Sequence, residues 1–193
     1  MSFEVNIKNA SDGAIAQVTP NNQLVVKSES NSQQHYISRN FGQSYQIFGR
    51  TGTLTAATTT VLHIKNNDPE RDIVISFMRM QLVGANVADS VDDYFELGFG
   101  RDVASGGAEV TAVNMNRKVG AQALITGTDS GPTMSGTFIG TERWHPAASG
   151  DANTFQKAGS IILGLGDTFE IRYVGTSTTG IAEARITFMM TDQ

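Results

Sequence analysis

The chain has 193 residues, 20 glycines, no cysteine and a net charge of -5 at pH 7. The missing cysteines exclude disulfides, thiolate nucleophiles and cysteine-based metal centres, and the acidic balance disfavours a sequence-independent contact with nucleic acid, which needs clustered Lys and Arg. The many Gly, Thr and Ser residues and a charged fraction of only 17% are typical of short strands joined by tight turns. We therefore predict an all-β protein, a β-sandwich or jelly roll with an extended N-terminal arm.

No apolar run approaches the roughly 18 residues that cross a membrane. The N-terminal sequence MSFEVNIKNASDG also lacks the basic and apolar blocks of a signal peptide. These features predict synthesis in the cytoplasm, with neither a membrane nor a nucleic acid as partner.

Residues 1–50 are predicted to form the arm, with short strands in it. Alternating apolar residues flank the turn TPNN, in which Pro20 precedes two asparagines. A polar segment with scattered aromatic residues follows. An arm of this kind can add a strand to the edge of a partner's sheet, where its alternate side chains fill pockets. The arm residues expected to contact a partner are Val18, Leu24, Val26, Tyr36, Phe41 and Tyr45.

Residues 51–193 are predicted to form the folded domain. Leu62 and Ile64 precede the turn NNDPERD, which predicts a hairpin-like pair of strands joined at residues 66–72. A long strand-like segment is expected to follow, with the apolar residues Ile73, Ile75, Phe77, Met80 and Leu82.

The rest of the domain alternates in the same way. Another strand is expected at VDDYFELGFGRD, with Leu97 and Phe99 on one face, and shorter pieces follow it. The last third predicts three strands divided by LGLGD and GTSTTG, with Phe169, Ile171 and Tyr173 facing one way. The segment ERWHPAASGDANTFQKAG could hold one short helix. About eight short strands with Gly-rich turns indicate a sandwich or jelly roll.

The sequence contains no complete catalytic or metal-binding motif. GTDSGP at 127–132 is similar to the nucleophile loop of serine proteases, but it lacks the next glycine of that loop, and His63 lies in the strand pattern VLHIK. We interpret GTDSGP as a turn. The three histidines are far apart in sequence. We predict no catalytic, cofactor-binding or metal-binding residue.

The densest acidic group of the sequence consists of Asp89, Asp92, Asp93 and Glu96. Its spacing differs from that of a calcium loop, so a solvent-facing acidic loop is the favoured interpretation over a structural ion. Trp144, between Arg143 and His145, could contact a partner or a sugar, although an aromatic residue that covers one end of the sandwich is the commoner case.

Four segments bear on the family. They are AQVTPNNQLVV at 16–26, VLHIKNND with RDIVI at 61–75, AVNMNR at 112–117 and ILGLGDTFEIRYVG at 162–175. Together they resemble a group of tailed-bacteriophage virion structural proteins, in which a short N-terminal tail precedes a β-sandwich.

The resemblance implies a non-enzymatic protein on the capsid surface of a virion, made in the host cytoplasm. It implies capsid decoration or cement, with the major capsid protein or other virion proteins as partners. We also expect a homo-oligomer, and a trimer is the favoured state because closed symmetry multiplies weak contacts. Two alternatives stay open, a tail, neck or head–tail junction protein and a carbohydrate-binding module that uses Tyr94, Arg143 and Trp144.

Overall fold

A computed structural model describes most of the second of the two units into which the chain divides, residues 33–193. For residues 152–160 it describes the backbone alone. The described residues contain no helix, and hence none that could cross a membrane. The described ranges are 42–85, 92–116, 118, 121–146 and 152–192.

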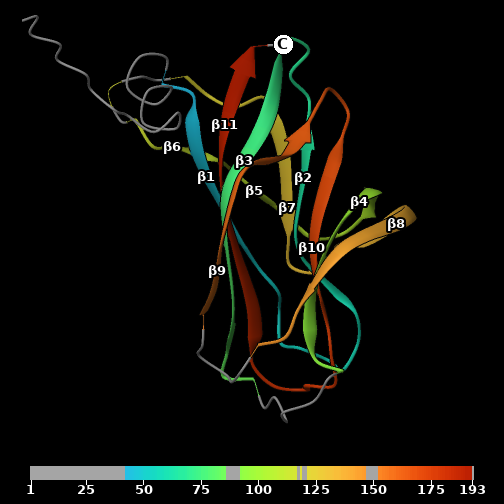
Figure 1. The fold of residues 1–193 in the computed structure, drawn as a ribbon. Coiled ribbons are helices and arrows are strands. Elements are labelled where there is room, and N and C mark those ends of the chain that lie inside the picture. The colour runs from blue at the N-terminus through green and yellow to red at the C-terminus, as the bar shows by residue number, and fades with distance from the viewer. Residues whose placement is uncertain (1–41, 86–91, 117, 119–120, 147–151, 193) are drawn as a thin grey trace, which may run out of the picture. The chain divides into compact units, whose positions relative to one another are not determined.

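Two antiparallel sheets lie face to face (Figure 1). The first sheet contains, in spatial order, β6 (Val113–Asn114), β1 (Ser44–Arg50), β11 (Ile181–Asp192), β3 (Arg71–Val83) and β9 (Ala152–Leu163). The second sheet contains β5 (Ala108–Val110), β7 (Ile125–Asp129), β2 (Thr59–Asn66), β10 (Thr168–Val174), β4 (Tyr94–Ser105) and β8 (Thr133–Trp144). The predicted all-β sandwich is therefore confirmed.

The strand order makes the sandwich a jelly roll. Strands β1, β11, β3 and β9 face β2, β10, β4 and β8, so the chain changes sheet at almost every connection. The exception is the step from β4 to β8, which pair with each other. Strands β5, β6 and β7 come between those two in the sequence and extend the opposite edges of both sheets.

The predicted hairpin around residues 66–72 is wrong. Strand β2 pairs with β7 and β10, whereas β3 pairs with β9 and β11 in the other sheet. The connection between β2 and β3 is a corner. It is fixed by Asp68, whose carboxylate accepts from the Glu70 backbone N–H at 3.0 Å and from the Arg71 side chain at 2.9 Å.

Asn66 holds this corner against the neighbouring strands. Its buried side-chain Nδ2 donates to the carbonyls of Arg71 and Leu163, each at 2.9 Å, and its Oδ1 accepts from the Asp68 backbone N–H. Its backbone also exchanges hydrogen bonds with Gly166 and Asp167 in the turn from β9 to β10. One residue at the end of β2 thus links both sheets.

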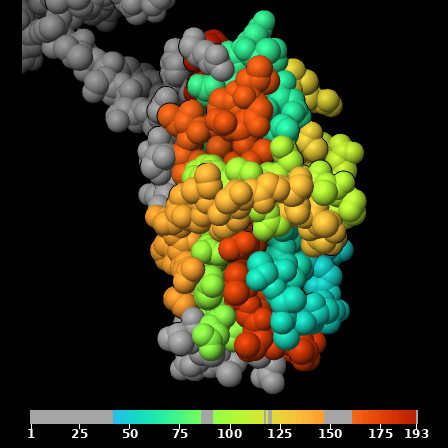
Figure 2. All heavy atoms as spheres, turned by 90° about the vertical axis from the view of Figure 1, so that its right-hand side faces the viewer, coloured from blue at the N-terminus to red at the C-terminus, as the bar shows by residue number. Residues whose placement is uncertain are grey.

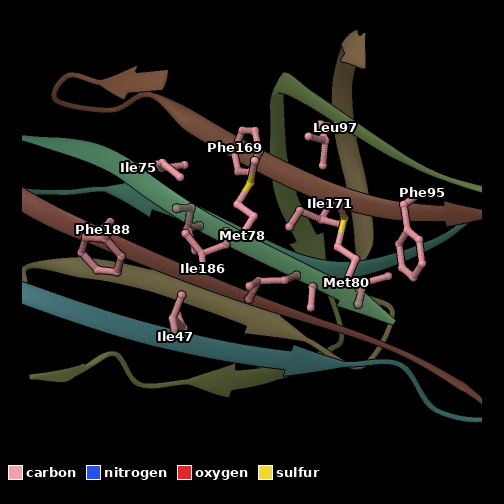
Figure 3. Close-up of a cluster of buried hydrophobic side chains, with 14 of the residues drawn as sticks. Ile47, Ile75, Met78, Met80, Phe95, Leu97, Phe169, Ile171, Ile186 and Phe188 are labelled. Carbon is pink, nitrogen blue, oxygen red and sulfur yellow. The ribbon is translucent and has the colours of Figure 1, made fainter. Parts of the chain in front are cut away.

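The core fills the space between the sheets. Figure 3 shows Phe169 of β10 beside Met78 of β3, and Ile171 beside Met80. All four side chains are fully buried. Tyr173 is fully buried too, so the prediction that Phe169, Ile171 and Tyr173 share one face of β10 is confirmed. Other fully buried members of this cluster are Ile47, Ile75, Phe95, Leu97, Ile186 and Phe188.

A β-bulge changes which residues of β3 face the core. Ile75 and Phe77 pair with consecutive residues of β11, so Ser76 is an extra residue in the ladder. Because a bulge reverses the alternation beyond it, Phe77 is only partly buried and Met78 takes the core position.

The expected boundary of the arm at residue 50 is also wrong. Residues 44–50 form β1, which pairs along its whole length with β11. Tyr45 has 0% exposure, and its ring stacks on Phe188 with 5.5 Å between centroids. Tyr45 is thus a core residue and its ring is not accessible to a partner. The expected short helix is contradicted where the structure describes that segment, since β8 extends to Trp144 and β9 begins at Ala152.

We predict that a chain starting at residue 33, where the second unit begins, keeps cooperative unfolding, whereas one starting at residue 51 loses it. The second deletion removes β1 with the buried side chains of Tyr45 and Ile47, each of which contributes about 1.5–3 kcal/mol. Urea denaturation followed by circular dichroism measures the unfolding midpoint and the cooperativity of both truncated chains. Equal unfolding midpoints for the two truncated chains would contradict the assignment of β1 to the domain.

We predict that Asn66→Ala lowers the free energy of unfolding by roughly 2–4 kcal/mol, because it leaves buried carbonyl and N–H groups without partners. The adjacent Asn67 is the matched control. Its exposed side chain makes one hydrogen bond, to Thr126, so Asn67→Ala costs less than about 1 kcal/mol. Chemical denaturation of both variants checks this, and equal losses would disprove the role of Asn66.

Candidate functional site

A groove of about 430 Å³ opens between the two sheets, on the side where β8 and β9 are the outermost described strands. In Figure 2 it lies between the gold band of β8 and the orange atoms above that band. We call it the edge groove. Its lining comes from β4, β8, β9 and the turn to β10: Phe99, Gly100, Asp102, Ile139, Ile162, Leu163, Gly166, Asp167 and Thr168.

The edge groove exposes aliphatic side chains to solvent. Ile139 is 59% exposed and Ile162 is 56% exposed, and Leu165 in the adjoining turn is 59% exposed. Phe99 is partly buried, packed against Phe169 with 5.5 Å between ring centroids. Single exposed apolar residues are common on protein surfaces, but a set that lines one hollow is typical of a binding site.

Glycines and a bulge form the walls of the edge groove. Strand β4 has a register shift between Phe99 and Arg101, and the intervening Gly100 has a φ of 87°. The backbone N–H of Gly100 donates to the Thr168 hydroxyl at 3.2 Å. In the β9–β10 turn the Asp167 carboxylate accepts from the Gly164 backbone N–H at 3.0 Å. These contacts fix the turn beside β4.

The polar groups of the edge groove already have partners. Asp102 forms an ion pair with Lys65 at 2.8 Å, and Asp167 is engaged by its own turn. Lys65 balances the charge of Asp102, and the exposed Asp167 adds one negative charge to the rim. Among the described residues, the lining of the groove is therefore mainly apolar.

A second group of polar residues lies on the outer face of the second sheet, beneath β8. Glu170 is 1% exposed, and one of its oxygens accepts from the Thr60 hydroxyl at 2.6 Å. Its other oxygen lies 3.5 Å from the Arg101 Nε. His63 is directly opposite Glu170 on β2, and its Nε2 contacts the Arg101 carbonyl at 2.9 Å. This arrangement joins β2, β10 and β4.

Glu96 is the centre of the neighbouring ion-pair network. It accepts from Arg172 at 2.6 Å and from Arg143 at 3.1 Å. Burial alone would raise the pKa of Glu96, but these hydrogen bonds outweigh burial and hold the pKa below its ordinary value. The Arg172 guanidinium lies 3.6 Å from the centroid of the Phe138 ring, so β8 covers the network. The network is satisfied internally.

The predicted acidic loop is only partly solvent-facing. Asp93 is buried and accepts from the Tyr173 hydroxyl at 2.6 Å and from the Thr176 backbone N–H at 2.8 Å. Burial raises the pKa of the Tyr173 hydroxyl, and the hydrogen bond to the Asp93 carboxylate raises this pKa further. Asp93 and Glu96 therefore connect strands, and Asp89 lies outside the described residues. The part of the chain that the structure describes contains no cluster of His, Asp and Glu able to hold a metal ion.

The second half of GTDSGP, residues 130–132, forms the predicted turn between β7 and β8, whereas residues 127–129 are the end of β7. Ser130 and Gly131 both have positive φ, and the Ser130 hydroxyl donates to Asp129 at 2.9 Å. The His63 Nε2 points to the Arg101 carbonyl instead. No nucleophile–base pair is formed here.

Trp144 is partly buried and packs against the core, as an aromatic residue that covers one end of the sandwich would. Both neighbours of Trp144 contact Tyr94. Arg143 lies 4.9 Å from the centroid of the Tyr94 ring, and the His145 ring centroid is 5.6 Å away. The aromatic surface that a sugar would need is thus partly occupied.

Of the remaining predicted partner-contact residues, Val18, Leu24, Val26, Tyr36 and Phe41 lie outside the described residues. Sequence reasoning did not single out Ile139, Ile162 or Leu165 as a surface. The alternation in GTFIGT indicates a strand, and the sequence ILGLGD indicates a turn. Neither pattern indicates that this strand and this turn lie side by side in the fold. In comparisons with known proteins, no family model and no curated protein matches the chain.

We predict that His63 makes stability depend on pH. Burial lowers the pKa of His63, so the native state resists a proton that the unfolded chain accepts. Its contribution is complete above the unfolded pKa of about 6.5 and is lost as the pH falls, at up to about 1.4 kcal/mol per pH unit. Urea midpoints measured between about pH 7 and 5 should fall less steeply for His63→Gln. Parallel curves for the variant and the natural chain would contradict this.

Proposed function

We propose that the protein is a structural protein of a tailed-bacteriophage virion, which decorates or cements the capsid by stabilising contacts between subunits of the major capsid protein. In this proposal it has no enzymatic role and acts as a homo-oligomer. The N-terminal residues and the edge groove supply its contacts with other proteins.

The edge groove is the observation that supports this proposal best. Exposed Ile139, Ile162 and Leu165 lie where both sheets end in long strands, β8 and β9, that have no further described neighbour. A strand edge of this kind is a template for pairing with another chain, and adjacent apolar pockets select the side chains of that chain. Such a surface suits protein assembly better than catalysis.

The fold agrees with the proposal by analogy. Jelly rolls form viral capsid and lectin domains, although a fold alone never defines a function. The ion-pair network beneath β8 stiffens the second sheet, since Glu96 and Glu170 each connect neighbouring strands. A rigid sandwich with an exposed apolar edge suits a protein that binds between the subunits of a shell.

Two alternatives differ from this proposal in specific ways. A tail, neck or head–tail junction protein would use the same surface but be present in few copies. A carbohydrate-binding module would need open aromatic faces, and the contacts of Tyr94 with Arg143 and His145 count against it.

We predict that the purified full-length chain binds capsids of its own phage that lack it, and that it does so in high copy number. Co-sedimentation followed by quantitative mass spectrometry of the particle fraction measures both quantities. A shell protein follows the capsid symmetry and gives on the order of hundreds of copies, whereas a tail or neck ring gives about a dozen or fewer. The second outcome would move the protein from the capsid to the tail.

Deletion of residues 1–30 should abolish attachment while the domain stays folded, because it removes Val18, Leu24 and Val26 but leaves β1 intact. Circular dichroism of the truncated chain provides the folding control. Full occupancy by the truncated chain would disprove the role of the arm. Failure of the full-length chain to bind capsids at any salt concentration would disprove the capsid proposal as a whole.

A further inference from the structure

We propose that the outer face of the first sheet binds a carboxylate side chain from an acidic segment of a partner protein, held between the guanidinium groups of Arg79 and Arg185. This binding surface goes beyond the proposed function, because it names the chemistry of a partner and does not depend on a capsid. We call it the arginine patch. It consists of residues from β1, β3 and β11: Phe48, Arg50, Arg79, Gln81, Glu183 and Arg185.

The arginine patch lies on the side of the first sheet that faces away from the second sheet. Successive side chains of a strand point to opposite faces, and Met80 and Ala184, which alternate with residues of the patch, are buried in the core. On the outer face, Phe48 is directly opposite Arg185, and Arg185 is directly opposite Arg79. Phe48 is 40% exposed and both arginines are exposed. This row of side chains is therefore open to a partner.

The arginines of the patch differ from the other arginines that the structure describes. Those four form ion pairs with buried carboxylates: Arg71, Arg101, Arg143 and Arg172. Within the described ranges, no carboxylate forms an ion pair with Arg50, Arg79 or Arg185. These three arginines against one glutamate give the patch a net positive charge, although the chain as a whole has a net charge of -5. Such a patch is complementary to an acidic surface.

The cross-strand pair of Arg79 and Arg185 has the geometry of a site for an oxyanion. Directly opposite residues of antiparallel strands have Cβ atoms about 4.5–5.5 Å apart, and like charges in such a pair are destabilising. A carboxylate has two oxygens, so it can accept from both guanidinium groups at once and offset their repulsion. Arginine suits this contact because its planar fork of N–H groups matches the geometry of a carboxylate.

Neighbouring side chains orient the two guanidinium groups. The Arg79 Nη2 donates to the Gln81 Oε1 at 3.1 Å, and the Gln81 Nε2 donates to the Glu183 carboxylate at 2.5 Å. The Arg185 guanidinium lies 5.8 Å from the centroid of the Phe48 ring. Because a guanidinium has five N–H donors, each arginine keeps donors for a ligand.

The size of the hollow between these side chains favours a carboxylate over a larger anion. The hollow has a volume of about 40 Å³ and is lined in part by Phe48, Arg79 and Arg185. A single water needs roughly 10–15 Å³, so the hollow holds a group of a few atoms and excludes a nucleotide base. The exposed ring of Phe48 offers apolar surface to the methylene groups of a glutamate, which inorganic phosphate lacks. A carboxylate side chain of a protein therefore fits best.

A blocked oligoglutamate peptide is the probe, and an oligoglutamine peptide of the same length is its control. Fluorescence anisotropy of the labelled peptides with the full-length chain measures the affinity. We expect saturable binding of the glutamate peptide alone. Arg79→Gln and Arg185→Gln should each weaken this binding by about tenfold or more, because a hydrogen bond between charged groups contributes at least that factor.

Two matched variants separate the geometry of the patch from its charge. Lys118→Gln removes one positive charge at an exposed position outside the patch, and it should leave the affinity nearly unchanged. Arg79→Lys keeps the charge but loses the planar fork, so it should weaken binding several-fold. The folding control is the urea midpoint of Arg79→Gln. This midpoint should not fall, because the substitution removes a like-charge pair and breaks no described ion pair.

Each other outcome overturns the inference. Equal binding of the two peptides, or no binding, means that the patch does not recognise carboxylates. Equal losses in Arg79→Gln and Lys118→Gln mean that net charge alone attracts the peptide, and full affinity of Arg79→Lys means that the fork has no role. Displacement of the peptide by an equal concentration of inorganic phosphate means that the ligand is a phosphate. A lower urea midpoint of Arg79→Gln means that Arg79 serves the fold. Capsid binding by a chain that fails these tests would leave the proposed function standing.

Discussion

The jelly roll depends on a buried corner in which one asparagine side chain connects β2 to two strands of the other sheet, β3 and β9. Asn66 ends β2, yet its hydrogen bonds reach the start of β3, the end of β9 and the turn into β10. A buried amide of this kind is stabilising only when all its hydrogen-bonding groups have partners. Here they do, and the connection between the two sheets is fixed in one geometry.

The edge groove follows from the same corner. Asn66 exchanges backbone hydrogen bonds with Gly166 and Asp167, which holds the β9–β10 turn and its exposed Leu165 at the end of β2. Gly100 lies at a register shift of β4, and its backbone N–H donates to the Thr168 hydroxyl, which joins β4 to the start of β10. The hollow is therefore built by backbone geometry, and its aliphatic side chains are held apart by strands from opposite sheets. A surface fixed in this way binds a partner without first having to order itself, which lowers the entropic cost of association.

The charged residues of the second sheet have a different role. Glu96 and Glu170 are almost completely buried, yet each is matched by arginines from neighbouring strands and covered by β8. Buried ion pairs add little net stability, because desolvation offsets their attraction, but the loss of one partner is costly. We therefore regard this network as a device that specifies the pairing of β10, β4 and β8. His63, next to it, adds a group whose charge is disfavoured in the native state.

Local patterns in the sequence were sufficient to locate most of the strands. The inward faces of β4 and β10, the turn at GTDSGP and the three final strands follow from alternation and turn residues, because these depend on near neighbours in the chain. Alternation alone does not reveal the bulge at Ser76, because the bulge is decided by the partner strand β11. Tyr45 looked like an exposed anchor in a polar segment, and only its pairing with β11 and stacking on Phe188 make it part of the core.

The sequence by itself thus determined an all-β sandwich, the absence of cysteine chemistry and the approximate strand positions. The tertiary structure decided which strands pair, that β2 and β3 belong to different sheets, and that Ile139 and Ile162 share one hollow. The physical reason is the range of the forces involved. Alternation and turn geometry act over a few residues, whereas sheet pairing and burial join residues far apart in the chain, whose meeting is not encoded in any single segment.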